Sequence, residues 1–189
     1  MKTIAATALL ASAAGIFHAQ LALASTHVPV ADAPAGAATL QLAGEGRLRY
    51  LGLAIYRARL WVAPQFDPLD YGAHPLVLEL TYDRAFSAAA IAQRSLAEMR
   101  RIGPVSAEQA ARWQLALQAA LPDVQPGDRL SGRYQPGEGV RFELRGRSTG
   151  AVPDPDFARL FFGIWLAPQT SEPGLRAQLL GARVGGAPP

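Results

Sequence analysis

Residues 76–103, LVLELTYDRAFSAAAIAQRSLAEMRRIG, change from the period of a β-strand to the period of an α-helix. In residues 76–82 a leucine or tyrosine alternates with other residue types, so one face of the strand is apolar. Ser87 then precedes a helical pattern that runs to about Arg101, and Gly103-Pro104 ends it. A strand with one apolar face, followed by an amphipathic helix, indicates a sheet that is covered by helices.

Further strands and helices are expected on both sides of this stretch. The expected strands are residues 39–43, 47–51, 54–62, 129–134, 140–144 and 150–152. The expected helices follow a capping box at Ser106, an Asp154-Pro155 start and a cap at Ser171, the last one covering residues 172–180. Strands and helices come in blocks and do not alternate one by one. This order predicts an α+β fold with an antiparallel sheet covered by helices.

The chain begins with the features of a secretory signal peptide. Lys2 precedes a small, apolar stretch, and Ala22-Leu23-Ala24 has the A-x-A pattern of a cleavage site, which predicts cleavage between Ala24 and Ser25. The stretch is rich in alanine and contains polar residues, which argues against a membrane anchor, and a lipid anchor would need a cysteine. We therefore expect a signal peptide at residues 1–24, a periplasmic or secreted protein, and no stable membrane anchor after cleavage.

The rest of the chain is expected to form one domain. Residues 25–38 are small, polar and proline-bearing, and residues 182–189 are rich in glycine and proline, so both segments are expected to be flexible. Residues 39–181 then form the folded domain. Its oligomeric state does not follow from the sequence.

The composition excludes several kinds of chemistry. The chain has no cysteine, and Lys2 is its only lysine, so a thiolate nucleophile, a cysteine zinc site and a Schiff base in the mature chain are excluded. His27 and His74 have no metal-ligand spacing, and we expect neither a metal nor a cofactor. Basic residues are spread along a chain of formal net charge +3, so nucleic acid is not an expected partner.

Arginine and tyrosine on the first strands are candidate binding residues. Tyr56 lies on the apolar face of its strand, where it either makes one hydrogen bond in the core or donates a hydrogen bond to a ligand. Arg47 and Arg49 share a face of the preceding strand. That face is either solvated or a site that recognises a carboxylate or oxyanion.

Helical residues supply the other candidates. Arg94 and Ser95 are neighbours on the helix after Ser87, and Ser95 interrupts its apolar face. The Ser95 hydroxyl either bonds back to its own helix or faces a pocket between helix and sheet. Trp113 and Trp165 lie on the apolar faces of later helices and belong either to the core or to the wall of a pocket.

Several segments, taken in their order along the chain, carry a family resemblance. They include GEGRLRYLGLAIYRARLWV (residues 44–62), PGD before a strand (126–128) and FARLFFGIWL (157–166). Together, over about residues 39–181, they resemble the chalcone isomerase-like family, in particular its bacterial exported branch. The resemblance implies an open-faced β-sandwich with a ligand cleft between sheet and helices. It implies either an isomerase that closes a flavanone ring, or a protein in which an arginine and a tyrosine hold the carboxylate of a fatty acid.

The family arginine has no direct counterpart in this chain. The family pattern G-x-G-x-R, set on residues 44–46, places Leu48 at the position of the arginine. Arg47 and Arg49 flank Leu48 but face the other side of a regular strand. Either a bulge re-registers the strand, or the arginine is absent here. Tyr56 matches a tyrosine position of the family.

Three functions are compatible with these residues. The first is non-catalytic binding of an apolar, anionic small molecule, such as a fatty acid, in the cleft. The second is an isomerase of the chalcone type, for which positioning and charge stabilisation suffice. The third is a structural or interaction module whose cleft is filled by its own side chains. The apolar composition and the lack of a nucleophile or metal site favour the first.

Overall fold

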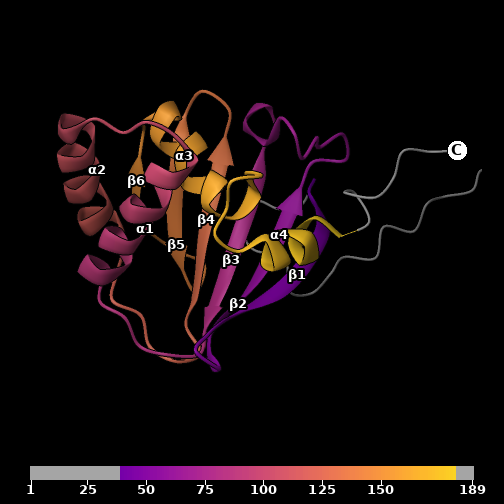
Figure 1. Cartoon of the computed structure of the whole chain (residues 1–189), viewed down its shortest axis with the longest axis horizontal. Helices are drawn as coiled ribbons and strands as arrows, with labels where there is room; N and C mark the ends of the chain where they lie inside the picture. Colours follow the sequence, from indigo (N-terminus) through magenta and orange to yellow (C-terminus); the bar gives the residue numbers. More distant parts are fainter. Residues whose placement is uncertain (1–38, 182–189) are drawn as a thin grey trace, which may run out of the picture. The chain divides into compact units, whose positions relative to one another are not determined.

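The computed structural model describes residues 39–181, and Figure 1 shows one antiparallel sheet with helices packed against it. The strands, in their order across the sheet, are β1 (Gln41–Tyr50), β2 (Leu53–Val62), β3 (Leu76–Tyr82), β4 (Arg129–Gln135), β5 (Gly139–Leu144) and β6 (Arg147–Val152). The helices are α1 (Ala88–Ile102), α2 (Ala107–Ala120), α3 (Pro155–Leu166), α4 (Pro173–Leu180) and a short 3-10 turn, η1 (Tyr71–Ala73). The predicted α+β class, an antiparallel sheet covered by helices, is confirmed.

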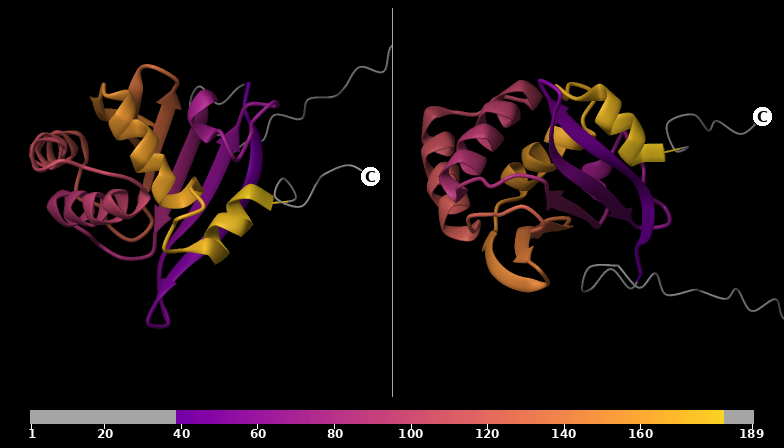
Figure 2. Two further views of the ribbon diagram at one scale, coloured as in Figure 1. Left: turned by 45° about the horizontal axis from the view of Figure 1, so that its top comes forward. Right: turned by 90° about the horizontal axis from the view of Figure 1, so that it is seen from below.

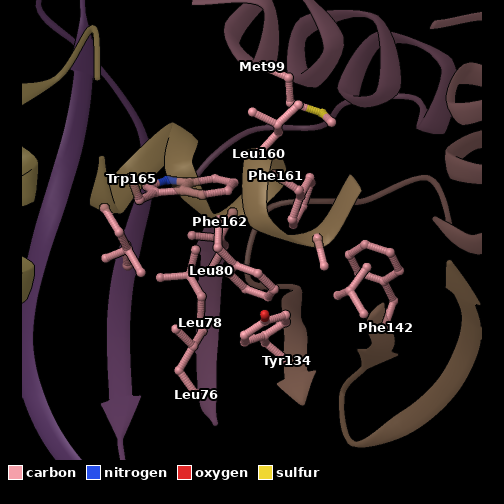
Figure 3. Close-up of a cluster of buried hydrophobic side chains, with 14 of the residues drawn as sticks. Leu76, Leu78, Leu80, Met99, Tyr134, Phe142, Leu160, Phe161, Phe162 and Trp165 are labelled. Carbon is pink, nitrogen blue, oxygen red and sulfur yellow. The ribbon is translucent and has the colours of Figure 1, made fainter. Parts of the chain in front are cut away.

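Alternation along β2 and β3 creates the inner face of the sheet. Leu60 lies opposite Leu78, and Ala58 lies opposite Leu80, in the antiparallel register of the two strands. All four side chains are buried. All four belong to one buried cluster, and Figure 3 shows Leu78 and Leu80 facing aromatic side chains of α3 across the core. Labelled in that view are Leu76, Leu78, Leu80, Met99, Tyr134, Phe142, Leu160, Phe161, Phe162 and Trp165. Burial of this apolar surface is the main force that holds the helices to the sheet.

Three helices begin at side-chain caps that the sequence predicts. The Ser87 hydroxyl accepts a hydrogen bond from the backbone N–H of Ala90 at 3.2 Å. Ser106 and Gln109 form the reciprocal hydrogen bonds of a capping box at the start of α2. Asp154 caps α3 and is followed by proline at the first helical position. These caps satisfy backbone donors that have no partner inside the helix.

The first strand differs from the prediction. Two strands were expected, at residues 39–43 and 47–51, but β1 is continuous and contains both Gly44 and Gly46. These glycines lie against α4, since a Cβ atom built at Gly44 would be 2.7 Å from the carbonyl oxygen of Leu179. Gly44 therefore allows the α4 backbone to approach β1, Gly46 leaves room for the α4 side chains of Leu175 and Gln178, and neither glycine interrupts the strand.

Two further boundaries also differ. The strand expected at residues 150–152 is longer, because Arg145 and Gly146, with φ of 51° and 78°, form a tight turn between β5 and β6. Ser171 does not cap α4, which begins two residues later. Its hydroxyl instead donates a hydrogen bond to Oε2 of Glu98 at 2.8 Å.

Several predictions concern residues outside the described range. The signal peptide at residues 1–24, its cleavage between Ala24 and Ser25, and the segments 25–38 and 182–189 remain predictions. Among residues 39–181, no helix is both long enough and apolar enough to cross a bilayer. The same residues contain no group of three or more acidic, histidine or cysteine side chains placed to hold a metal.

Candidate ligand-binding site

A cavity of about 370 Å³, referred to below as the cleft, lies between the inner face of the sheet and helices α1 and α3. Its apolar and aromatic walls are made by Leu48, Tyr50, Ile55, Leu80, Tyr82, Phe86, Ala90, Ile91, Leu121, Leu130, Phe161 and Ile164. Its remaining lining residues are Tyr56, Arg94, Ser95, Glu98, Trp165, Ser171 and Glu172. Sites for small molecules are typically about 300–1,000 Å³ and mostly apolar with a few polar groups, so the cleft has their size and character.

The sheet contributes a row of side chains to the cleft. Leu48, Tyr56 and Tyr82 lie opposite one another across β1, β2 and β3. The rings of Tyr56 and Tyr82 meet edge to face, with their centroids 5.9 Å apart. The Tyr56 phenol therefore contacts both Tyr82 within the sheet and Trp165 near the C-terminal end of α3.

The Tyr56 hydroxyl is held by Trp165. Nε1 of Trp165 donates a hydrogen bond to the Tyr56 oxygen at 3.0 Å. Burial raises the pKa of Tyr56 well above its ordinary value of 10.0, and this outweighs the lowering by the Trp165 hydrogen bond. The phenol therefore stays protonated at neutral pH. A phenol that accepts from an indole N–H keeps its own hydrogen to donate, so Tyr56 is suited to hold an oxygen atom of a ligand.

A buried carboxylate organises the polar lining contributed by α1. Glu98 is only 7% exposed and forms an ion pair with Arg94, whose Nη2 lies 2.7 Å from Oε1. The hydroxyl of Ser171 and, at 3.7 Å, Nε of Arg101 approach the other oxygen of Glu98. Arg94 itself is 68% exposed and has N–H donors beyond the one used for Glu98. The buried Ser95 lies beside it on the wall of the cleft.

The strand arginines do not line the cleft, and Leu48 does. Nε of Arg47 lies 3.8 Å from Oδ2 of Asp83, and both side chains are partly exposed. Nη1 of Arg49 donates to the carbonyl oxygen of Gly52 at 3.4 Å, within the turn that follows β1. The arginine position of the family pattern is therefore occupied by leucine in the cleft.

The alternative of a re-registered strand is answered by the pairing of β1 with β2. Leu48 lies opposite Tyr56, but the next residue, Arg49, lies opposite Ala54. The extra residue is thus Ile55, on β2, and it lines the cleft. This irregularity places an isoleucine in the cleft lining. Neither it nor the other irregularity of the pairing, between Leu42 and Gly44, brings Arg47 or Arg49 into that lining.

Trp113 also lies away from the cleft. It is 2% exposed, its ring packs against Phe157 with the centroids 5.6 Å apart, and its Nε1 donates to Oδ2 of Asp154 at 2.8 Å. It therefore ties α2 to the start of α3. The structure brings Tyr56, Arg94, Ser95 and Trp165 together and leaves Arg47, Arg49 and Trp113 outside.

Three polar residues of the cleft were not among the sequence candidates: Glu98, Ser171 and Glu172. The spacing of Arg94 and Glu98, four residues apart on a helix, is a signal for an ion pair that the sequence contains. The contact of Ser171 with Glu98 joins residues 73 positions apart, and no local pattern indicates it.

Comparison with known proteins identifies a family and solved structures of similar fold. A sequence model of a family described as chalcone isomerase-like matches residues 24–181. Among solved structures, a fatty-acid binding protein of Arabidopsis thaliana is similar, with a TM-score of 0.60 and 11% identity over 78% of this chain and 90% of that chain. At this identity the likeness concerns the fold. No curated protein matches the chain.

Proposed function

The chain belongs to the chalcone isomerase-like family, and on that basis we propose that it binds, without catalysis, an apolar small molecule with an anionic head, such as a fatty acid. The observation that carries this proposal is the cleft of about 370 Å³, whose walls are mostly apolar and whose polar groups include Tyr56 and Arg94. Burial of an acyl chain between these walls stabilises the complex by about 0.8 kcal/mol for each methylene removed from water.

The proposed head-group contacts come from β2 and α1. The Tyr56 O–H donates a hydrogen bond to an oxygen of the carboxylate, and the exposed guanidinium of Arg94 donates through the N–H groups that its ion pair with Glu98 leaves available. Burial is the main cause of the raised pKa of Tyr56; Glu172 raises this pKa further and Arg94 lowers it, as expected for charged groups close to the phenol. In this proposal an arginine on a helix takes the role that the family resemblance assigns to a strand arginine.

The two other functions have less support. An isomerase of the chalcone type needs positive charge beside the attacking phenolate; Leu48 lies at the position of the family arginine, and Arg94, the arginine of the cleft lining, is ion-paired with Glu98. A cleft filled by its own side chains would leave no room for a ligand. Trp165 and Phe161 do pack near Tyr56, but open volume remains beside them.

A matched pair of alanines on α1 tests ligand binding in the cleft. Ala90 lines the cleft, and its neighbour Ala89 is also exposed but does not line it. Displacement of a fluorescent fatty-acid probe by palmitate is expected to show saturable binding to the unchanged protein. Ala90→Trp should weaken palmitate binding about tenfold or more, because the indole takes space in the cleft and even the loss of about two buried methylenes of the ligand has this effect. Ala89→Trp should leave the affinity unchanged.

The Tyr56→Phe variant tests the head group in the same assay. Loss of the phenol should lower the affinity for palmitate about tenfold, the effect of one hydrogen bond to a charged group, and should leave the binding of an uncharged hydrocarbon unaltered. Absence of palmitate binding by the unchanged protein, or equal losses in Ala89→Trp and Ala90→Trp, would contradict the proposal. Turnover of a chalcone substrate above the uncatalysed rate would contradict its non-catalytic part.

We also propose that the protein is exported by the signal peptide at residues 1–24. The support is the sequence pattern that ends at Ala22-Leu23-Ala24. Mass spectrometry of the protein from cell fractions is expected to find a chain that starts at Ser25 in the periplasm or the medium. A soluble cytoplasmic chain that retains Met1 as the main product would contradict export.

A further inference from the structure

The turn between β1 and β2 carries an exposed apolar tip beside the cleft. Tyr50, Leu51 and Leu53, together called the hydrophobic tip below, are 61%, 85% and 51% exposed. In the left view of Figure 2, this turn is the indigo loop that projects from the described chain. Tyr50 also lines the cleft while being mostly exposed, so the cleft reaches the surface beside the tip. Adjacent exposed apolar side chains of this kind mark an interaction site more often than single exposed leucines do.

The backbone conformation of the tip makes its leucine unusual. Leu51 and Gly52 have φ of 49° and 79°. They form a two-residue hairpin turn between Tyr50 and Leu53, which are paired across β1 and β2. Turns with two positive φ values favour asparagine or glycine at the first position. The hairpin between β5 and β6 has the same pattern at Arg145-Gly146, where Arg145 forms an ion pair with Asp128. Leu51 is 85% exposed, so packing within the protein does not explain a leucine there.

The surroundings of the tip are positively charged. Arg49, within the hairpin, is exposed, as are Arg57 on β2 and Arg84 just after β3. The neighbouring carboxylate of Asp83 is paired with Arg47 at 3.8 Å. That of Asp123, on the segment beside the start of α1, accepts a hydrogen bond from the backbone N–H of Ala88 at 2.8 Å. Exposed apolar side chains with arginines on neighbouring segments complement a bilayer with anionic lipid head groups.

We propose that the hydrophobic tip inserts into the surface of a bilayer that contains anionic phospholipid. Tyr50, Leu51 and Leu53 enter the region between head groups and acyl chains, and the arginines contact lipid phosphates. The open side of the cleft is then held next to lipid, so an apolar ligand passes between bilayer and cleft with little exposure to water. This last consequence rests on the proposed function, whereas the membrane contact does not.

Flotation with vesicles of phosphatidylcholine and phosphatidylglycerol tests the contact. Leu51→Asn is expected to weaken vesicle binding about tenfold or more, because a buried leucine side chain contributes this much to transfer from water. Asparagine tolerates the left-handed backbone, so the hairpin is preserved. Leu69→Asn is the matched control, since Leu69 is 82% exposed in a different loop, and it should bind as the unchanged protein does. All three proteins are prepared with the same N-terminus, so that a difference in flotation between them comes from the substituted leucine.

Each outcome separates this inference from the proposed function. Equal flotation of the Leu51→Asn variant and the unchanged protein would overturn the inference, as would no binding to anionic vesicles. Self-association that Leu51→Asn abolishes, without vesicle binding, would overturn it in favour of a protein contact. Palmitate binding is measured separately without vesicles, and there Leu51→Asn should equal the unchanged protein. Flotation that depends on Leu51, in the absence of palmitate binding, would support the membrane contact and contradict the proposed fatty-acid binding.

Discussion

Replacement of Phe161 by alanine is expected to lower the free energy of unfolding by about 3–5 kcal/mol, the usual cost of truncating a buried phenylalanine. Phe161 is 6% exposed and lies on α3, between the core and the cleft. Its ring centroid is 5.4 Å from that of Phe157 and 5.5 Å from those of Phe142 and Trp165. Removal of the ring therefore leaves space that several aromatic neighbours cannot fill without moving.

Urea unfolding at neutral pH measures this change. The more conservative Phe161→Leu should cost less than half as much, because a leucine fills most of the vacated space. The alanine variant should also accept bulkier apolar ligands, since the new space joins the cleft. A cost below about 1 kcal/mol for Phe161→Ala would show that the neighbouring rings close the space, and would contradict the assignment of Phe161 as a wall of a preformed cleft.

The second large effect is expected at the contact of β1 with α4. Gly44→Ala should lower the free energy of unfolding by about 2–3 kcal/mol, because the new methyl group meets backbone, which cannot rotate away. A Cβ atom built there would contact the carbonyl oxygen of Gln178 and lie 2.7 Å from that of Leu179. The whole helix must then shift. Ser171 and Glu172, which precede α4, line the cleft, so palmitate affinity should fall as well.

Gly174→Ala is the control on the same helix. Nothing lies within 4 Å of a Cβ atom built at Gly174, and alanine favours the helix by about 1 kcal/mol, so this variant should be unchanged or more stable. Chemical unfolding and limited proteolysis near α4 compare the two. Equal stabilities of the Gly44→Ala and Gly174→Ala variants would contradict the close packing of α4 on β1.

Local patterns were sufficient to predict most elements of the fold. The alternation in residues 54–62 and 76–82 and the caps at Ser87 and Ser106 depend on residues that are close in the sequence. An exception was β1, which was predicted as two separate strands on either side of Gly44 and Gly46. The reason for these glycines is α4, more than a hundred residues later, as the contact between Arg47 N–H and Gln178 Oε1 across 131 positions illustrates.

The candidate site was predicted less completely. Tyr56 was singled out because strand alternation places it on the apolar face, and it lies in the cleft. Trp113 and Trp165 have the same character in the sequence, since both lie on apolar faces of helices. Only the position of each helix in the fold distinguishes the two tryptophans: α2 places Trp113 against Phe157, and α3 places Trp165 against Tyr56.

The sequence by itself determined the α+β class, the apolar faces of the strands, and the exclusion of cysteine chemistry from the chain and of lysine chemistry from residues 39–181. These properties follow from composition and from periodicity over a few residues. The tertiary structure alone decided that Leu48 and not a neighbouring arginine faces the cleft, and that Arg94 and Glu98 meet Ser171 there. The physical reason is that a cavity is enclosed by segments far apart in the chain, and their relative positions depend on the packing of α3 aromatic rings and on the approach of α4 to Gly44.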